Sequence, residues 1–141
     1  MFMSDCIFCK ILDGEIPSSK VYEDDYVYAF LDISQVTEGH TLVIPKKHCQ
    51  DLYELDQTTA SELFKAVPLI ANAMKAAFTP KGLNMLNNNG SFADQSVFHF
   101  HLHLIPRYDE TDGFKLNWEV HGDNYTPEKL QSLADKIHNN L

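Results

Sequence analysis

The sequence is short of basic residues and has no long apolar run, and both shortages exclude classes of protein. Its 141 residues include 11 Lys and Arg against 20 Asp and Glu, which gives a formal net charge of −9. A field of that sign repels nucleic-acid duplexes and anionic membrane surfaces. No apolar stretch approaches the ~20 residues of a bilayer span, and the first residues lack the basic start of a secretory signal. We expect a cytoplasmic protein that binds neither a nucleic-acid duplex nor a membrane.

Cysteine is also scarce. The three cysteines are an odd number and do not form a disulfide framework. Cys6 and Cys9 stand in C-x-x-C spacing, which in a reducing compartment indicates metal ligands or a redox pair. No thioredoxin-like βαβ pattern surrounds them, which disfavours the redox role. Two free thiols on a helix are the third possibility.

Glycine and proline, six residues each, nowhere gather into a linker, and the chain contains no internal repeat. Hydrophobic residues make up 44% of the chain, which is typical of a packed globular core. The length is that of one ordinary domain. We therefore predict a single domain over residues 1–141.

The hydrophobic pattern predicts an α+β fold with a largely antiparallel sheet. A short helix over 6–12 would be capped by Ser4 or Asp5. A long helix over 59–78 would open with a capping box at 59–62, and Pro68 would kink it or mark a shift in its packing. Its buried face would include Phe64, and an amphipathic helix would follow Pro127. The β-rich runs predict strands over 20–23, 26–31, 40–45, 83–87 and 97–106.

Three histidines alternate with apolar residues inside the last of these strands. His99, His101 and His103 would share one face of the strand, because successive side chains point to opposite faces. Such a row can be an ordinary polar face, a zinc site of three imidazoles, or a catalytic array with a nucleophilic imidazole. A histidine at neutral pH is mostly unprotonated, so its lone pair can attack phosphorus without an activating base.

The segment His-Phe-His-Leu-His-Leu-Ile at 99–105 resembles the signature of the histidine-triad (HIT) family. Other separated blocks, at 6–11, 14–17, 30–34, 40–48 and 88–96, are similar to the Hint-like branch of that family, so the resemblance covers roughly residues 6–107. It implies a HIT-like fold, in which an antiparallel sheet and a long helix form the core and two copies join into a homodimer with one continuous sheet. Residues 108–141 would be a C-terminal extension.

The resemblance implies a hydrolase of purine nucleoside 5′-phosphoramidates and related nucleotidyl-amine conjugates, acting through a covalent nucleotidyl-histidine. By position, His101 is similar to the nucleophile and His103 to the residue that contacts phosphate and assists the leaving amine. His40 is similar to the residue that supports them from the neighbouring strand. Relatives that transfer nucleotides carry glutamine where this chain has His103. Two other functions stay open: cleavage of dinucleoside polyphosphates, and a non-catalytic nucleotide sensor or interaction module.

The same resemblance implies the residues that hold the nucleotide. Asp32 would bind both ribose hydroxyls, although an Asp that simply ends a strand is the alternative. Asn88 and Ser96 match phosphate contacts, and backbone N–H groups from Gln95 onward could add donors. The base would lie among apolar side chains that could equally belong to the core: Ile7, Phe8, Ile11, Phe30 and Ile33.

Bacterial-type members with the C-x-x-C pair resemble zinc proteins, and this likeness implies a structural Zn²⁺ held by Cys6, Cys9, His48 and His99. Two sulfur and two nitrogen ligands are a usual closed zinc set. His101 and His103 would then stay free for chemistry. Cys49 is the rival fourth ligand, disfavoured because it neighbours His48 and faces the other way on a strand.

The extension carries an alternating apolar run at Phe114, Leu116 and Trp118. In the family, the segment after the triad reaches the active site of the partner subunit. The resemblance therefore implies that this run tunes substrate choice across a dimer.

Overall fold

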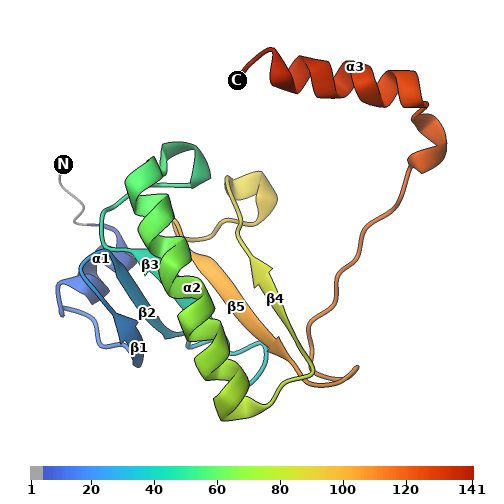
Figure 1. The fold of residues 1–141 in the computed structure, drawn as a ribbon. Helices are drawn as coiled ribbons and strands as arrows, with labels where there is room; N and C mark the ends of the chain where they lie inside the picture. Colours follow the sequence, from blue (N-terminus) through green and yellow to red (C-terminus); the bar gives the residue numbers. More distant parts are fainter. Residues whose placement is uncertain (1–4) are drawn as a thin grey trace.

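The computed structural model describes residues 5–141 and has an α+β fold built on one antiparallel sheet (Figure 1). In space the five strands follow the order β1, β2, β3, β5, β4. The fold class expected from the sequence is confirmed. The strands are β1 (Lys20–Glu23), β2 (Val27–Leu31), β3 (Thr41–Pro45), β4 (Gly82–Leu86) and β5 (Leu102–Arg107).

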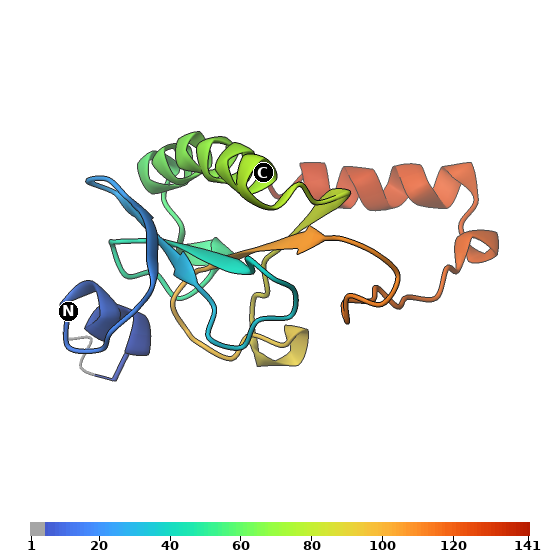
Figure 2. The ribbon, with the colours of Figure 1, turned by 90° about the horizontal axis from the view of Figure 1, so that it is seen from below.

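Helices cover both faces of the sheet. The long helix α2 (Gln57–Phe78) lies across one face, and the short helix α1 (Ile7–Leu12) lies on the other (Figures 1 and 2). Because strand side chains alternate, β2 and β3 contribute to both layers. The layer under α2 includes Val27, Ala29, Val43, Leu63, Ile70, Leu102 and Leu104, and the layer under α1 contains Phe8, Phe30, Leu42 and Ile44.

The helix starts differ from the sequence expectation. Helix α2 begins two residues early, because the side chain of Asp56 accepts from the backbone N–H of Thr59 at 2.8 Å and also from its hydroxyl. The predicted capping box at 59–62 is therefore wrong. At α1 the cap is Cys6, whose sulfur accepts from the N–H of Cys9, and not Asp5. The other expected cap, Ser4, lies outside the described residues.

Helix α2 continues through Pro68, which faces solvent. Phe64 is 45% exposed, so its predicted place on the buried face is wrong. The buried stripe instead passes through Leu63, Ala66 and Val67. A side chain one position from a buried residue turns about 100° around the helix, which carries Phe64 out of the stripe.

Strand β5 is shorter than predicted, since residues 97–101 are not strand. The N–H of Phe100 donates to the carbonyl of Cys49 at 2.7 Å, outside the sheet ladder. Pairing with β3 covers Leu102 to Leu104 only. The alternation still holds in burial, because Phe100 and Leu102 pack under α2 while the histidines lie on the α1 side.

Beyond β5 the chain leaves the sheet and reaches α3 (Pro127–His138), which stands apart from the other elements (Figures 1 and 2). The side chain of Thr126 caps α3 and Pro127 occupies its first turn, as the sequence predicts. Three short 3-10 turns complete the fold, at Leu52–Glu54, Ser91–Ala93 and Gly122–Asn124. Among residues 5–141, no helix is both long and apolar enough for a bilayer crossing.

Candidate functional site

A pocket of about 350 Å³ lies on the α1 side of the sheet. Its walls come from α1, the segment after it, the end of β2 with the following loop, and the segment that precedes β5. Most of the wall is apolar, and its polar side chains are those of three serines, Asp32 and two histidines. The lining residues are Ile7, Phe8, Ile11, Ile16, Pro17, Ser18, Phe30, Leu31, Asp32, Ile33, Ser34, Leu42, Ser96, Val97, His101 and His103.

The ring of His101 is buried and fixed in one tautomer. Its Nδ1–H donates to the backbone carbonyl of His99 at 2.8 Å, so in the neutral ring the lone pair is on Nε2. Burial lowers the pKa of His101, which favours that neutral ring. The edge of Phe8 packs against it at 5.2 Å between ring centres, and Asn87 donates to the backbone carbonyl of His101 at 2.9 Å. His101 therefore offers an uncharged, immobilised nitrogen lone pair.

His40 and His103 form a directed hydrogen-bond chain. The backbone N–H of Val36 donates to His40 Nδ1 at 3.3 Å, so the proton of the neutral His40 ring is on Nε2. That Nε2–H donates to Nδ1 of His103 at 2.9 Å. The second nitrogen of His103 must then carry the ring's proton. Burial lowers the pKa of His103 to about 4 and also lowers the pKa of His40. At neutral pH both rings are uncharged, and His103 is a donor at Nε2.

Asp32 lines the pocket and lies close to His40. One carboxylate oxygen accepts from the N–H of Ser34 at 2.7 Å, and the other is 3.6 Å from His40 Nε2. Its side chain is 18% exposed, so an acceptor oxygen stays within reach of a ligand.

The structure brings together most, but not all, of the predicted nucleotide residues. Asp32, Ser96 and the five predicted apolar residues line the pocket, although Ile33 is 100% exposed and lies at its rim. Asn88 is outside the lining and makes a long 3.4 Å contact to the carbonyl of Asp94. Gln95 is buried, and its side chain bonds the backbone of Gly90 and Gln50.

Cys6, Cys9, His48 and His99 could hold a metal ion, because one ligand atom from each lies within 4.8 Å of the others. The ring of His99 faces the cluster in the right tautomer: its Nε2–H donates to the carbonyl of Pro45 at 2.8 Å, which leaves the Nδ1 lone pair 3.4 Å from the sulfur of Cys6. Burial raises the pKa of the Cys9 thiol to about 12, so a cation is needed to stabilise its thiolate. Cys49 is instead in the hydrophobic core under α2.

Asp32, His40 and His103 form a second group with metal-ligand spacing. Its hydrogen bonds do not suit a cation. A ligating imidazole normally donates through its other nitrogen, whereas Nδ1 of His40 accepts from Val36. If a metal bound Nε2 of His40, the proton of the neutral ring would be on Nδ1. That Nδ1–H would then face the backbone N–H of Val36, and two donors would oppose each other. The group therefore fits a proton-donor chain and not a metal.

Sequence reasoning missed several residues that shape this site. Gln35 and Asn87 bond the backbone next to His40 and His101, and Ile16 to Ser18 supply part of the pocket wall. Pro17 belongs to a block that resembles the family, so a signal existed there without an assigned role. For Gln35 no signal existed, because its partners are backbone groups.

The comparisons with known proteins agree with this geometry. Residues 13–110 match the HIT domain family, and the chain belongs to that family. A crystal structure of a HIT family protein from Bacillus anthracis is 61% identical, with a TM-score of 0.96 and 99% of each chain covered. A Candida albicans relative named adenosine 5′-monophosphoramidase HNT1 is 39% identical over 142 residues, which span 98% of this chain and 92% of the relative.

A zinc-bound histidine triad family protein from Mycobacterium smegmatis is also similar. That crystal structure is 31% identical to this chain, with a TM-score of 0.74, and the match covers 98% of this chain and 99% of the other.

Proposed function

We propose that this protein hydrolyses purine nucleoside 5′-phosphoramidates and related nucleotidyl-amine conjugates. His101 Nε2 attacks the α-phosphorus, and the phosphorus–nitrogen bond breaks as the nucleotidyl-histidine forms. The leaving nitrogen gains one proton. Water then attacks the same phosphorus, the bond to Nε2 breaks, and that water gives up one proton, so the two steps balance. The likeness to a relative named as a phosphoramidase supports this choice of substrate.

One observation carries the proposal: a lone pair on Nε2 of His101, to which no described residue donates a hydrogen bond, and an N–H donor occur side by side on neighbouring rings. His101 and His103 have ring centres 5.1 Å apart, and both line the pocket. Displacement at phosphorus spreads negative charge over the non-bridging oxygens, and donors fixed in advance stabilise that charge. His101 supplies the nucleophile, and His103 donates to a phosphoryl oxygen or to the leaving nitrogen.

The apolar and polar side chains of the pocket indicate where the rest of the nucleotide would bind. The base would lie against the apolar wall of Phe8 and Phe30, and the ribose hydroxyls would donate to Asp32. Ser96 lines the same pocket as His101 and His103, and its hydroxyl would donate to phosphate. We also propose that Asn88 and Gln95 contribute to nucleotide binding through the loop that carries them. This loop would have to move for the side chain of Asn88 to reach a ligand.

The test is hydrolysis of adenosine 5′-phosphoramidate by the wild type and by His101→Ala. We expect the variant to lose activity by about a thousandfold or more while it still binds AMP. His121→Ala, which changes an exposed histidine of the extension, is the matched control and should retain full activity. Turnover that persists in His101→Ala would rule out covalent catalysis at this ring. A wild type active only on dinucleoside polyphosphates, or on no nucleotide, would support one of the two other functions.

We also propose that Zn²⁺ fills the Cys6, Cys9, His48 and His99 cluster in a structural role. Cys9 lies in α1 and Cys6 caps it, and the histidines come from loops next to β3 and β5. Four protein ligands leave no open position for a substrate. The ion would then fasten α1, and with it the apolar wall of the pocket, to the sheet.

Finally, we propose a cytoplasmic homodimer built from a HIT core over 6–107 and an extension over 108–141. Strand β4 is an edge of the sheet and exposes Leu83 and Met85, so a second copy could pair there and continue the sheet. The detached helix α3 exposes Leu130 and Ile137, which a partner would cover. Light scattering on the full chain should give twice the 16.1 kDa chain mass. A monomer would exclude this arrangement.

A further inference from the structure

The side-chain amide of Gln35 closes the loop that leads from β2 to His40. Its Nε2 donates to the carbonyl oxygens of Asp32 at 2.6 Å and His40 at 2.7 Å. Its Oε1 accepts from the N–H groups of Gly39 at 2.9 Å and His40 at 3.1 Å. A single exposed side chain thus satisfies four backbone groups of the loop.

This loop conformation brings the N–H of Val36 to Nδ1 of His40. The contact has a chemical consequence, because a backbone N–H can only donate. His40 must therefore accept at Nδ1 and carry its proton on Nε2, where it donates to His103. If the Val36 contact were lost, the protons of His40 and His103 could sit on either nitrogen. His103 would then spend part of its time without a donor at Nε2.

We propose that Gln35 is a positioning residue that sets the tautomers of His40 and His103, and thereby the hydrogen-bond donor that His103 presents in the pocket. The effect on turnover rests on the proposed function. The effect on tautomers rests on the hydrogen bonds alone, so the two can be tested separately.

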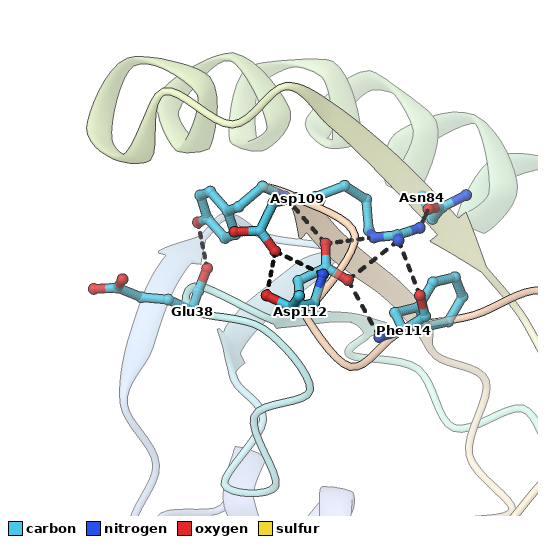
Figure 3. Close-up of polar contacts among 8 residues, drawn as sticks. Glu38, Asn84, Asp109, Asp112 and Phe114 are labelled. Carbon is cyan, nitrogen blue, oxygen red and sulfur yellow. Dashed lines mark hydrogen bonds and ion pairs between the residues drawn. The ribbon is translucent and has the colours of Figure 1, made fainter.

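Other contacts hold the same loop from outside without touching His40. The hydroxyl of Tyr108 donates to the carbonyl of Glu38, at the root of the C-terminal extension (Figure 3). Gly39 packs against Phe78, where an added Cβ would come within 2.7 Å of the ring. Tyr108→Phe therefore removes support from the loop and leaves the Gln35 bonds in place. It separates general loop stability from tautomer control.

The test uses Gln35→Glu in the purified full-length protein. The carboxylate has almost the same shape and can accept from Gly39 and His40, but it cannot donate to the two carbonyl oxygens and is repelled by them. Ring ¹⁵N NMR spectra at neutral pH report which nitrogen carries the proton. In the wild type we expect Nε2–H for His40 and His103 and Nδ1–H for His101. In Gln35→Glu and in Gln35→Ala, the first two rings should show mixed tautomers, while His101 keeps its own.

Kinetics give the second measurement. We expect kcat for phosphoramidate hydrolysis to fall about tenfold in both variants, with a smaller change in KM, because the lost donor acts on the transition state. Tyr108→Phe, and Gln131→Glu on the exposed helix α3, should leave ring shifts and kcat near wild type. Wild-type tautomers in both Gln35 variants would overturn the proposal. Altered tautomers in a protein that hydrolyses no phosphoramidate would refute the proposed function and leave the positioning role intact.

Discussion

The Nε2–H of His40 donates to Nδ1 of His103 over 2.9 Å, although 63 positions separate them in the sequence. The register of the sheet accounts for this contact. Leu42 pairs with His103 across β3 and β5, and His40, two positions before Leu42, lies on the same face of the sheet, so it is a diagonal neighbour of His103. Two separate blocks of sequence thus form one hydrogen-bond chain, which runs from the backbone of Val36 through His40 to His103 and into the pocket.

Replacing His103 by Ala should remove the donor of this chain. We expect kcat for phosphoramidate hydrolysis to fall about a hundredfold to a thousandfold, which is typical for the loss of one fixed donor to a developing oxyanion. AMP affinity should change much less. Steady-state kinetics and a binding titration measure the two effects. The matched control is His138→Ala on α3, and an unchanged kcat in His103→Ala would show that this ring does not act on the reacting atoms.

Cys6 and Cys9 should be required for zinc binding, whereas Cys49 should not be required. We expect about one zinc per wild-type chain and almost none in Cys9→Ser, because loss of one thiolate opens a four-ligand site. Cys49→Ser is the control: its side chain lies in the core under α2, so the variant should lose stability but keep its zinc. Elemental analysis of the purified proteins measures the zinc content per chain. Equal zinc in Cys9→Ser and wild type would remove Cys9 from the site.

Much of this fold follows from periodicity in the sequence. Five apolar runs became the five strands, and the repeat of Leu63, Ile70 and Met74 became the core face of α2. Two of the errors came where a hydrogen bond outside the expected element satisfies a backbone group. Asp56 caps α2 ahead of the predicted box, and the backbone N–H of Phe100 bonds the carbonyl of Cys49 outside the sheet, so β5 begins later than predicted.

The candidate site shows the same division. The alternation of His101 and His103 and the C-x-x-C pair could be read from spacing, because each depends on residues close in sequence. The tautomers could not, since they depend on the carbonyl of His99, the N–H of Val36 and the bonds of Gln35. Sequence patterns do not encode the direction of such backbone groups.

Asp32→Asn should weaken nucleotide binding and reduce the preference for ribose. A carboxylate can accept from both ribose hydroxyls, whereas an amide has only one acceptor oxygen. Hydrogen bonds to a charged group are worth about 1.5–3 kcal/mol, so AMP affinity should fall about tenfold or more. Affinity for 2′-deoxy-AMP should fall less. Calorimetric titration with both ligands measures the ratio, and Asp25→Asn, in the exposed hairpin turn, should bind as wild type. An undiminished ribose preference in Asp32→Asn would show that Asp32 does not bind the ribose.

The start of the C-terminal extension should make the stability of the protein against unfolding fall at low pH, and Asp112 is the residue responsible. Its carboxylate is 5% exposed and accepts from Arg107 Nε at 2.8 Å and from the N–H of Tyr108 at 3.1 Å (Figure 3). The bond from Arg107 lowers the pKa of Asp112 to about 2 from an ordinary 3.8. A carboxylate with a lowered folded pKa stabilises the protein above the unfolded value, and that contribution is lost as pH falls from about 4 to about 2.

Asp112→Asn should therefore be less stable than wild type at pH 7, and the difference should shrink as the pH is lowered from about 4 toward about 2. Urea unfolding at several pH values measures it. Asp123→Asn, in the exposed turn before α3, is the control and should follow wild type throughout. The ion pair with Arg107 predicts convergence because protonated Asp112 and Asn are both uncharged. A difference that stays constant down to pH 2 would mean that the ionised carboxylate does not stabilise the root of the extension.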